Sequence, residues 1–127
     1  MKENVVREKS YRFALRIVDA YKTLSNEKKE FVLAKQMLRS ATAIGANVEE
    51  ADAAISRAEF SAKISIGYKE ARETSYWLRL LYESRYLDER SFDTLFAACD
   101  ELCRLLRAIL RSSGRIRTGA ADNSQSA

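Results

Sequence analysis

The segment from Gln36 to Ala51, QMLRSATAIGANVEEA, constrains the fold more than any other part of the chain. It lacks Pro, so nothing in it breaks a helix, and small residues recur along it at Ser40, Ala41 and Gly45. Small side chains on one face let a second helix approach closely, because the distance between packed helices depends on the side chains at their contact. The segment therefore predicts a tightly packed bundle of helices.

The composition permits long helices and few turns. The 127 residues include no Pro and only 4 Gly, and 46% are hydrophobic while 31% are charged. These values are typical of one soluble domain. The opening MKENVVREKS lacks the apolar run of a secretory signal, and no segment has the roughly 20 apolar residues that span a bilayer. We expect a cytoplasmic protein without a membrane partner.

Four segments repeat their apolar residues with a period near 3.6, which predicts helices over residues 4–24, 27–54, 57–85 and 89–112. Ser56 and Glu59 have the spacing of a capping box at the start of the third. The fold class is therefore all-α: an antiparallel up-down-up-down four-helix bundle over residues 1–113, with a disordered tail over 114–127. The second and third helices have these expected core stripes: Phe31, Ala34, Leu38, Ala41, Gly45, Val48 and Ile55; and Phe60, Ile64, Tyr68, Ala71, Ser75, Leu78 and Tyr82.

Residues that would support catalysis or metal binding are scarce. The chain has no His, which removes the commonest general base and metal ligand. Cys99 and Cys103 lie one helical turn apart and are expected to be small core side chains, since two cysteines alone make no structural zinc site. There is no Gly-rich phosphate loop and no nucleophile elbow. We expect no enzyme, no metal, no cofactor and no small-molecule substrate.

The third predicted helix has more apolar residues than one core face can use. Ile66, Trp77 and Leu80 fall roughly opposite its core stripe, and Tyr11 and Leu15 lie off the main stripe of the first helix. Exposed apolar surface of this kind indicates an interface between subunits. The alternative is a bent helix, or one that is buried on two sides.

Arginines gather near both ends of the chain, which carries a net charge of +4. In an up-down bundle the end of the fourth helix lies beside the start of the first, and several arginines in a row could bind phosphate. The alternative is a solvated surface whose bases suit the helix dipole or pair with acids such as Glu49 and Asp52. The candidate nucleic-acid-binding residues are Arg7, Arg12, Arg16, Arg104, Arg107, Arg111 and Arg115.

Polar side chains of the second helix are expected to form hydrogen bonds and ion pairs between helices that fix their register. Carboxylates for such pairs, or for a metal site, could come from Glu70 and Glu73, but the Glu-x-x-His pattern of di-metal bundles is missing. The polar and small residues of this structural motif are Gln36, Arg39, Ser40, Ala41, Asn47 and Glu50.

These residues resemble a family signature. The motif from Gln36 to Ala51 and the run KEARETSYWLRLL, Lys69 to Leu81, resemble the small bacterial four-helix-bundle proteins, also called large-subunit ribosomal RNA intervening-sequence proteins. The similarity covers about residues 10–110. It implies a ring-like homopentamer. It also implies kinship with the accessory protein of diversity-generating retroelements, which binds RNA and a reverse transcriptase through a basic surface. The resemblance implies no catalytic residues.

The leading hypothesis is a non-enzymatic homo-oligomer that binds structured RNA or a ribonucleoprotein. The rival is a protein-interaction scaffold without a nucleic-acid role. A third and weaker hypothesis is a small-molecule binder in the bundle core.

Overall fold

The computed structural model describes residues 2–113, which form four helices and contain no strand. The helices are α1 (Lys2–Asn26), α2 (Val32–Asp52), α3 (Arg57–Glu83) and α4 (Glu89–Ser112). The predicted tail, residues 114–127, and the candidate residue Arg115 lie outside the described residues. None of the four helices is long and apolar enough to cross a membrane.

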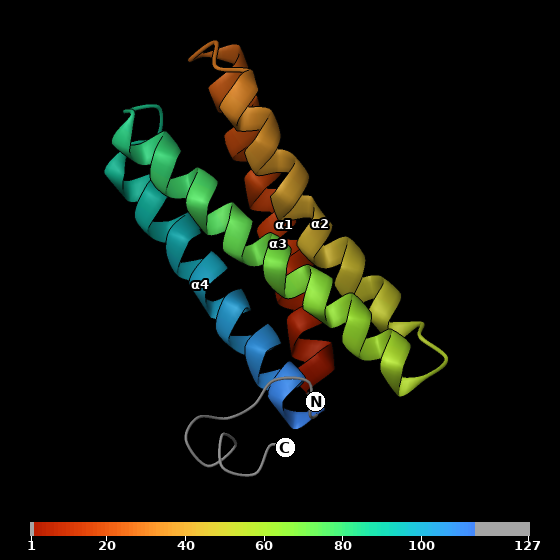
Figure 1. Ribbon diagram of the computed structural model, residues 1–127. Helices are drawn as coiled ribbons and strands as arrows, with labels where there is room; N and C mark the ends of the chain where they lie inside the picture. The colour runs from red at the N-terminus through yellow and green to blue at the C-terminus, as the bar shows by residue number, and fades with distance from the viewer. Residues whose placement is uncertain (1, 114–127) are drawn as a thin grey trace.

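Each helix packs against two others. The contacts join α1 to α2, α2 to α3, α3 to α4, and α4 back to α1, whereas the described parts of α1 and α3 are not adjacent in the bundle. The start of α1 and the end of α4 lie at the same end of the molecule (Figure 1). Helices α1 and α3 therefore occupy opposite corners of the bundle, and their outer faces point away from each other.

The core contains one stripe from each helix. Its largest fully buried side chains include Phe13 and Ile17 of α1, Met37 and Ile44 of α2, and Leu78 of α3. The apolar residues of α4 predict a core stripe of nine, of which Phe92, Phe96 and Cys103 are half-buried. The other six are buried: Leu95, Cys99, Leu102, Leu106, Ile109 and Leu110. Burial of apolar side chains at about 25 cal/mol per Å² is the main force that holds such a bundle together.

The second helix begins at Val32, five residues later than the predicted residue 27. Ser25 does not cap it, because the Ser25 hydroxyl donates to the Tyr21 carbonyl within the last turn of α1. Lys29 turns the chain with a φ of 57°, and the Glu30 carboxylate accepts from the backbone N–H groups of Leu33 and Ala34 at 2.6 and 3.2 Å. The predicted core residue Phe31 is consequently 55% exposed.

The connection between α2 and α3 contains the predicted cap. The Ser56 side chain accepts from the Glu59 N–H at 3.0 Å, and the Glu59 carboxylate accepts from the Ile55 N–H at 3.1 Å. This capping box is confirmed, although α2 ends at Asp52 rather than 54. Ile55, which the pattern placed in the core, is 94% exposed because it lies beyond the helix end.

The small residues of α2 face their neighbours as expected, with Ser40 and Ala41 fully buried. Helix α3 meets this face with a small residue of its own, since a Cβ on Gly67 would lie 3.6 Å from the Ile44 carbonyl oxygen. The core face of α3 is therefore turned toward α2. It buries Gly67, Thr74 and Leu81, where the pattern had placed Tyr68, Ser75 and Tyr82.

Candidate nucleic-acid interface

Three of the predicted arginines are neutralised by nearby carboxylates. Arg7 of α1 lies 3.1 Å from Glu49 and 3.4 Å from Asp52, both on α2. Hydrogen bonding to Glu49 and the charge of Asp52 raise the pKa of Arg7. The other two form pairs within their own helices: Arg12 with Glu8 at 2.8 Å, and Arg104 with Asp100 at 3.4 Å. The pairing of bases with local acids, the alternative from the sequence, therefore holds for these side chains.

Arg16, Arg107 and Arg111 have no ion pair with any residue in the described range 2–113. Arg107 is held by a hydroxyl instead. It donates to the Tyr68 oxygen of α3 at 3.2 Å, and Arg72, also of α3, donates to the same oxygen at 3.3 Å. Arg72 likewise has no carboxylate partner among these residues, so two guanidinium groups share one neutral acceptor.

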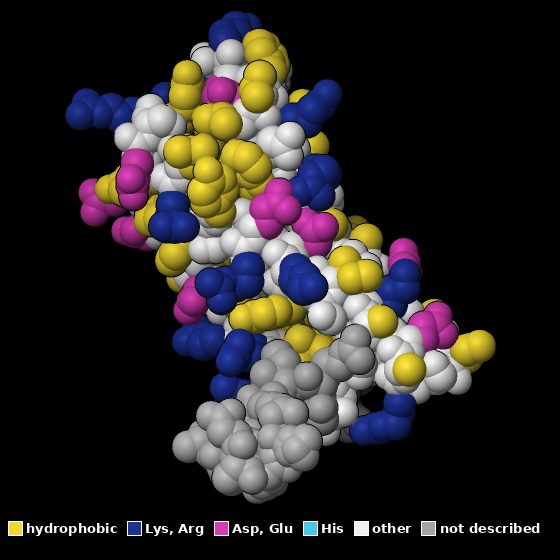
Figure 2. All heavy atoms as spheres, in the orientation of Figure 1, with side chains coloured by type: hydrophobic (Ala, Val, Ile, Leu, Met, Phe, Trp, Pro, Cys, Tyr) yellow, Lys and Arg dark blue, Asp and Glu magenta, His cyan; other side chains and the backbone are white. Residues whose placement is uncertain are grey.

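A shallow surface hollow of about 280 Å³ lies between α3 and α4 at this point, and we call it the arginine hollow. Figure 2 shows Lys and Arg side chains gathered over α4 and the adjoining stretch of α3. The hollow contains one carboxylate, that of Asp100, against three guanidinium groups. Its lining residues are Tyr68, Arg72, Ser75, Asp100, Cys103, Arg104 and Arg107.

The excess of positive charge in the hollow affects the pKa of the Tyr68 hydroxyl. Partial burial acts to raise the pKa of its hydroxyl and is the largest single effect. Hydrogen bonds from Arg72 and Arg107, together with their charges, outweigh burial and lower the pKa of Tyr68. Guanidinium groups in such surroundings can hold the oxygens of phosphate or carboxylate groups, because their fork of N–H donors fits both.

Tyr68 and Arg72 were not among the predicted residues, because the predicted positive surface consisted of arginines near the two ends of the chain. The spacing of Tyr68 and Arg72 in the sequence could have indicated that they act together. The two residues are four apart on α3, on the flank of its core stripe that faces α4. The predicted α1 arginines, by contrast, do not contribute to the arginine hollow.

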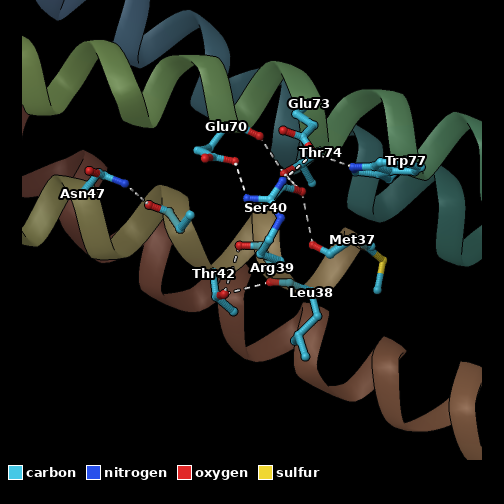
Figure 3. A network of polar contacts seen from close by, with 11 residues as sticks. Met37, Leu38, Arg39, Ser40, Thr42, Asn47, Glu70, Glu73, Thr74 and Trp77 are labelled. Atoms are coloured by element: carbon cyan, nitrogen blue, oxygen red, sulfur yellow. Dashed lines mark hydrogen bonds and ion pairs between the residues drawn. The ribbon is translucent and has the colours of Figure 1, made fainter. Parts of the chain in front are cut away.

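The family-motif residues of α2 form a polar network with α3 (Figure 3). Arg39 reaches across to Glu70 at 3.4 Å and to Glu73, which also accepts from the Trp77 indole N–H at 2.9 Å. The indole bond, followed by the bond from Arg39, lowers the pKa of Glu73. Below this surface pair, the hydroxyls of Thr74 and Ser40 lie 2.9 Å apart and are fully buried.

The rest of the motif is structural as well. The Asn47 amide donates to the Ala43 carbonyl within α2 at 2.9 Å, and Glu50 pairs with Lys63 of α3 at 2.7 Å. Ala41 is buried and Gln36 is half-buried. Within residues 2–113 no group of three or more Cys, Asp or Glu side chains could hold a metal ion.

The candidate interface residues lie on two separate faces. Tyr11 and Leu15 of α1 are 66% and 52% exposed, and Ile66 and Leu80 of α3 are 43% and 36% exposed. Trp77 is only half-buried in the α3 surface, with its ring edge-on to Tyr76 at 5.0 Å. Because α1 and α3 are not adjacent in the bundle, these side chains form two patches rather than one.

Apart from Trp77, the residues of both patches belong to regular rows on the outer faces. The residues of each row alternate in spacing between three and four, as in a coiled-coil seam, and each row is exposed or half-buried throughout. The α1 outer row is Glu8, Tyr11, Leu15, Val18 and Lys22; the α3 outer row is Ala62, Ile66, Lys69, Glu73, Tyr76 and Leu80.

Comparison with known proteins places this architecture in context. A family model described as 23S rRNA-intervening sequence protein matches residues 2–108. A crystal structure from Bacteroides thetaiotaomicron VPI-5482, described as a protein with unknown function from the S23 ribosomal protein family, is similar to the chain at 50% identity and a TM-score of 0.86. The match covers 87% of this chain and 99% of that one. No match was found among curated proteins.

Proposed function

The chain belongs to the family of 23S rRNA-intervening sequence proteins, and on this premise we propose that it is a non-enzymatic, cytoplasmic homo-oligomer that binds structured RNA or a ribonucleoprotein. The arginine hollow is the proposed contact surface. The contacts between successive helices and their short connections also support the antiparallel up-down-up-down order that the sequence predicts.

One observation carries the RNA proposal: Arg72 and Arg107 converge on Tyr68 without a carboxylate partner among residues 2–113. If these two positive charges served solubility alone, carboxylate partners for Arg72 and Arg107 would do the protein little harm. RNA helices are bound largely through phosphates and 2′-hydroxyls, which suits guanidinium and hydroxyl groups better than a pocket for bases. Arg111, farther along α4, extends the positive surface.

The ion pairs of Arg7, Arg12 and Arg104 support the rival proposal, a scaffold that binds a protein partner and no nucleic acid. These pairs consume positive charge that phosphate contacts would need. The two proposals therefore predict different RNA binding for the same pair of variants.

The test compares Arg72→Gln/Arg107→Gln with Arg7→Gln/Arg12→Gln, which removes the same charge from residues that already have carboxylate partners. Binding of a fluorescent RNA hairpin is measured between low and moderate salt. Each lost phosphate contact lowers the slope of log K against log salt by about 0.9. We expect the first variant to lose a slope of about 1.5 to 2 and the control to lose less than half of that. Equal behaviour of the two variants, or no binding by the wild type at low salt, would support the scaffold.

The proposed assembly follows from the two outer rows. The apolar residues of the α1 outer row lie between Glu8 and Lys22, whereas the α3 outer row has Lys69 and Glu73 among its apolar residues. Two different rows at opposite corners suit a head-to-tail contact in which the α1 row of one subunit packs on the α3 row of the next. Contacts of this kind close into a ring when the rotation between neighbouring subunits completes a full turn. The family resemblance suggests a ring of five copies.

Light scattering on a sizing column tests this assembly. We expect Leu15→Glu or Leu80→Glu to reduce the particle to smaller species. The control is Ile55→Glu, because Ile55 is 94% exposed in a connection and belongs to neither row. A wild-type monomer, or particles of unchanged size in all three variants, would overturn the arrangement.

A further inference from the structure

The two cysteines of the chain lie one turn apart on α4 in opposite surroundings. Cys99 is 0% exposed, and its sulfur lies 3.2 Å from the Ala71 carbonyl oxygen of α3, to which it donates. Cys103 is half-buried and lines the arginine hollow, which lies at the surface between α3 and α4. One thiol is enclosed in the core, and the other stands among three guanidinium groups.

The charged and titratable groups around Cys103 come from both helices. The charges of Arg72 of α3 and Arg104 of α4 favour the thiolate form of Cys103, whereas the charge of Asp100 opposes it. Tyr68 and Arg107 also line the hollow. The neighbouring Cys99 thiol and then the charges of Arg72 and Arg104 lower the pKa of Cys103, despite partial burial. The neighbouring Cys103 thiol and burial in the core raise the pKa of Cys99. The thiolate, which is the reactive form, therefore belongs to Cys103.

We propose that Cys103 is a modification site that exchanges with small disulfides bearing carboxylates, a class that includes glutathione disulfide. Cys103 loses its proton to solvent, and its sulfur attacks one sulfur of the disulfide. A new S–S bond forms to Cys103 while the original S–S bond breaks, and the departing thiolate keeps that electron pair. Cys103 is oxidised and the departing thiol is reduced, so no further oxidant is needed.

The hollow explains the choice of an anionic partner. Arg72 and Arg107 have no carboxylate partner among residues 2–113, and their donors can take up the carboxylates of an incoming disulfide beside the sulfur. A cleft lined by one sign of charge raises the local concentration of the opposite charge and the association rate by roughly tenfold or more. A neutral disulfide of similar reactivity gains none of this.

The experiment uses the full chain and two reagents, the dianionic dithiobis(nitrobenzoate) and the neutral dithiodipyridine. Cys99 is the built-in control. We expect one fast equivalent in the wild type that is lost in Cys103→Ser. In Cys99→Ala one equivalent should remain, with a slower rate because Cys99 no longer lowers the pKa of Cys103. Arg72→Gln/Arg107→Gln should slow the dianionic reagent about tenfold and the neutral one far less. It should also move the midpoint of the rate against pH upward. Mass spectrometry after treatment with glutathione disulfide should place one adduct on Cys103.

Two results would overturn the proposal: a Cys103 that reacts only after unfolding, or arginine variants that leave the ratio of the two rates unchanged. Circular dichroism of each variant shows whether the fold is intact, and the substituted arginines are exposed, so the helices should remain. No RNA is present in the assay. Failure here leaves the proposed RNA binding standing, and failure of RNA binding leaves the exchange standing.

Discussion

The buried hydroxyl pair between α2 and α3 gives a test of how this bundle fixes its register. Thr74 Oγ1 lies 2.9 Å from Ser40 Oγ and 2.8 Å from the Glu70 carbonyl oxygen, and both side chains are 0% exposed. Thr74→Val keeps the volume and removes the hydroxyl. Ser40 is then left with a long 3.4 Å contact to the Met37 carbonyl oxygen.

The magnitude follows from these contacts. A hydrogen bond contributes about 1 kcal/mol net, and a buried polar group left without a good partner costs about 1–3 kcal/mol. We expect Thr74→Val to lower the free energy of unfolding by about 1–2 kcal/mol. Ser40→Ala should cost about 1 kcal/mol, since Thr74 keeps its bond to Glu70. The double variant has no stranded hydroxyl on either side and should cost no more than Thr74→Val alone.

The assay is guanidinium unfolding followed by circular dichroism, with all variants at one protein concentration because assembly contributes to stability. Thr42→Val is the matched control. The Thr42 hydroxyl bonds only within α2, to Leu38 at 2.7 Å and less closely to Arg39, so its loss should cost well under 1 kcal/mol. The reasoning is refuted if the two single costs add within about 0.3 kcal/mol in the double variant, because then the hydroxyls are not coupled.

Three further predictions concern helix ends, pH and backbone. Ser56→Ala should lower the free energy of unfolding by about 1 kcal/mol and Ser56→Asp should restore it, because the cap must accept from the Glu59 N–H; chemical unfolding measures both. The pKa of Glu73 is lowered from its ordinary 4.5, so its contribution is complete above pH 4.5 and disappears as pH falls through the folded-state value. Glu73→Gln should therefore be less stable than the wild type at pH 7, by at most about 1 kcal/mol for this partly exposed group, and equal to it in strong acid. A gap that persists in acid would contradict this account. Gly67→Ala should raise the melting temperature, since a Cβ there meets the Ile44 oxygen at an ordinary 3.6 Å and Ala favours helix by up to about 1 kcal/mol. A fall would mean that α2 and α3 have no room for the methyl group.

The sequence predicted the four helices because their apolar stripes are long and regular. The stripe of α4 is the clearest case, and Leu95, Leu102 and Leu106 are buried as expected. The errors lie where a stripe runs past a helix end. Phe31 and Ile55 have the right spacing, yet Glu30 and Ser56 begin new helices beside them and leave both exposed.

The candidate site was less predictable from the residues alone. The sequence identified Arg104 and Arg107, but whether an arginine is paired depends on the neighbouring helix, as Arg7 shows with Glu49. Tyr68 joins Arg72 to Arg107 only because α3 turns its Thr74 face toward α2 and its Tyr68 flank toward α4. A periodic pattern does not fix that rotation within the width of one residue.

The placement of α1 and α3 at opposite corners has a consequence for size. The angle between the two outer rows depends on how the four helices pack inside a single subunit. In a closed head-to-tail ring, that angle determines how many subunits the ring contains. Copy number is then governed by the interior of the subunit. Ser40 and Gly45 belong to neither outer row. In the proposed ring, a bulkier residue at either position should widen the angle between the rows and change the number of subunits, although every side chain of both outer rows stays the same.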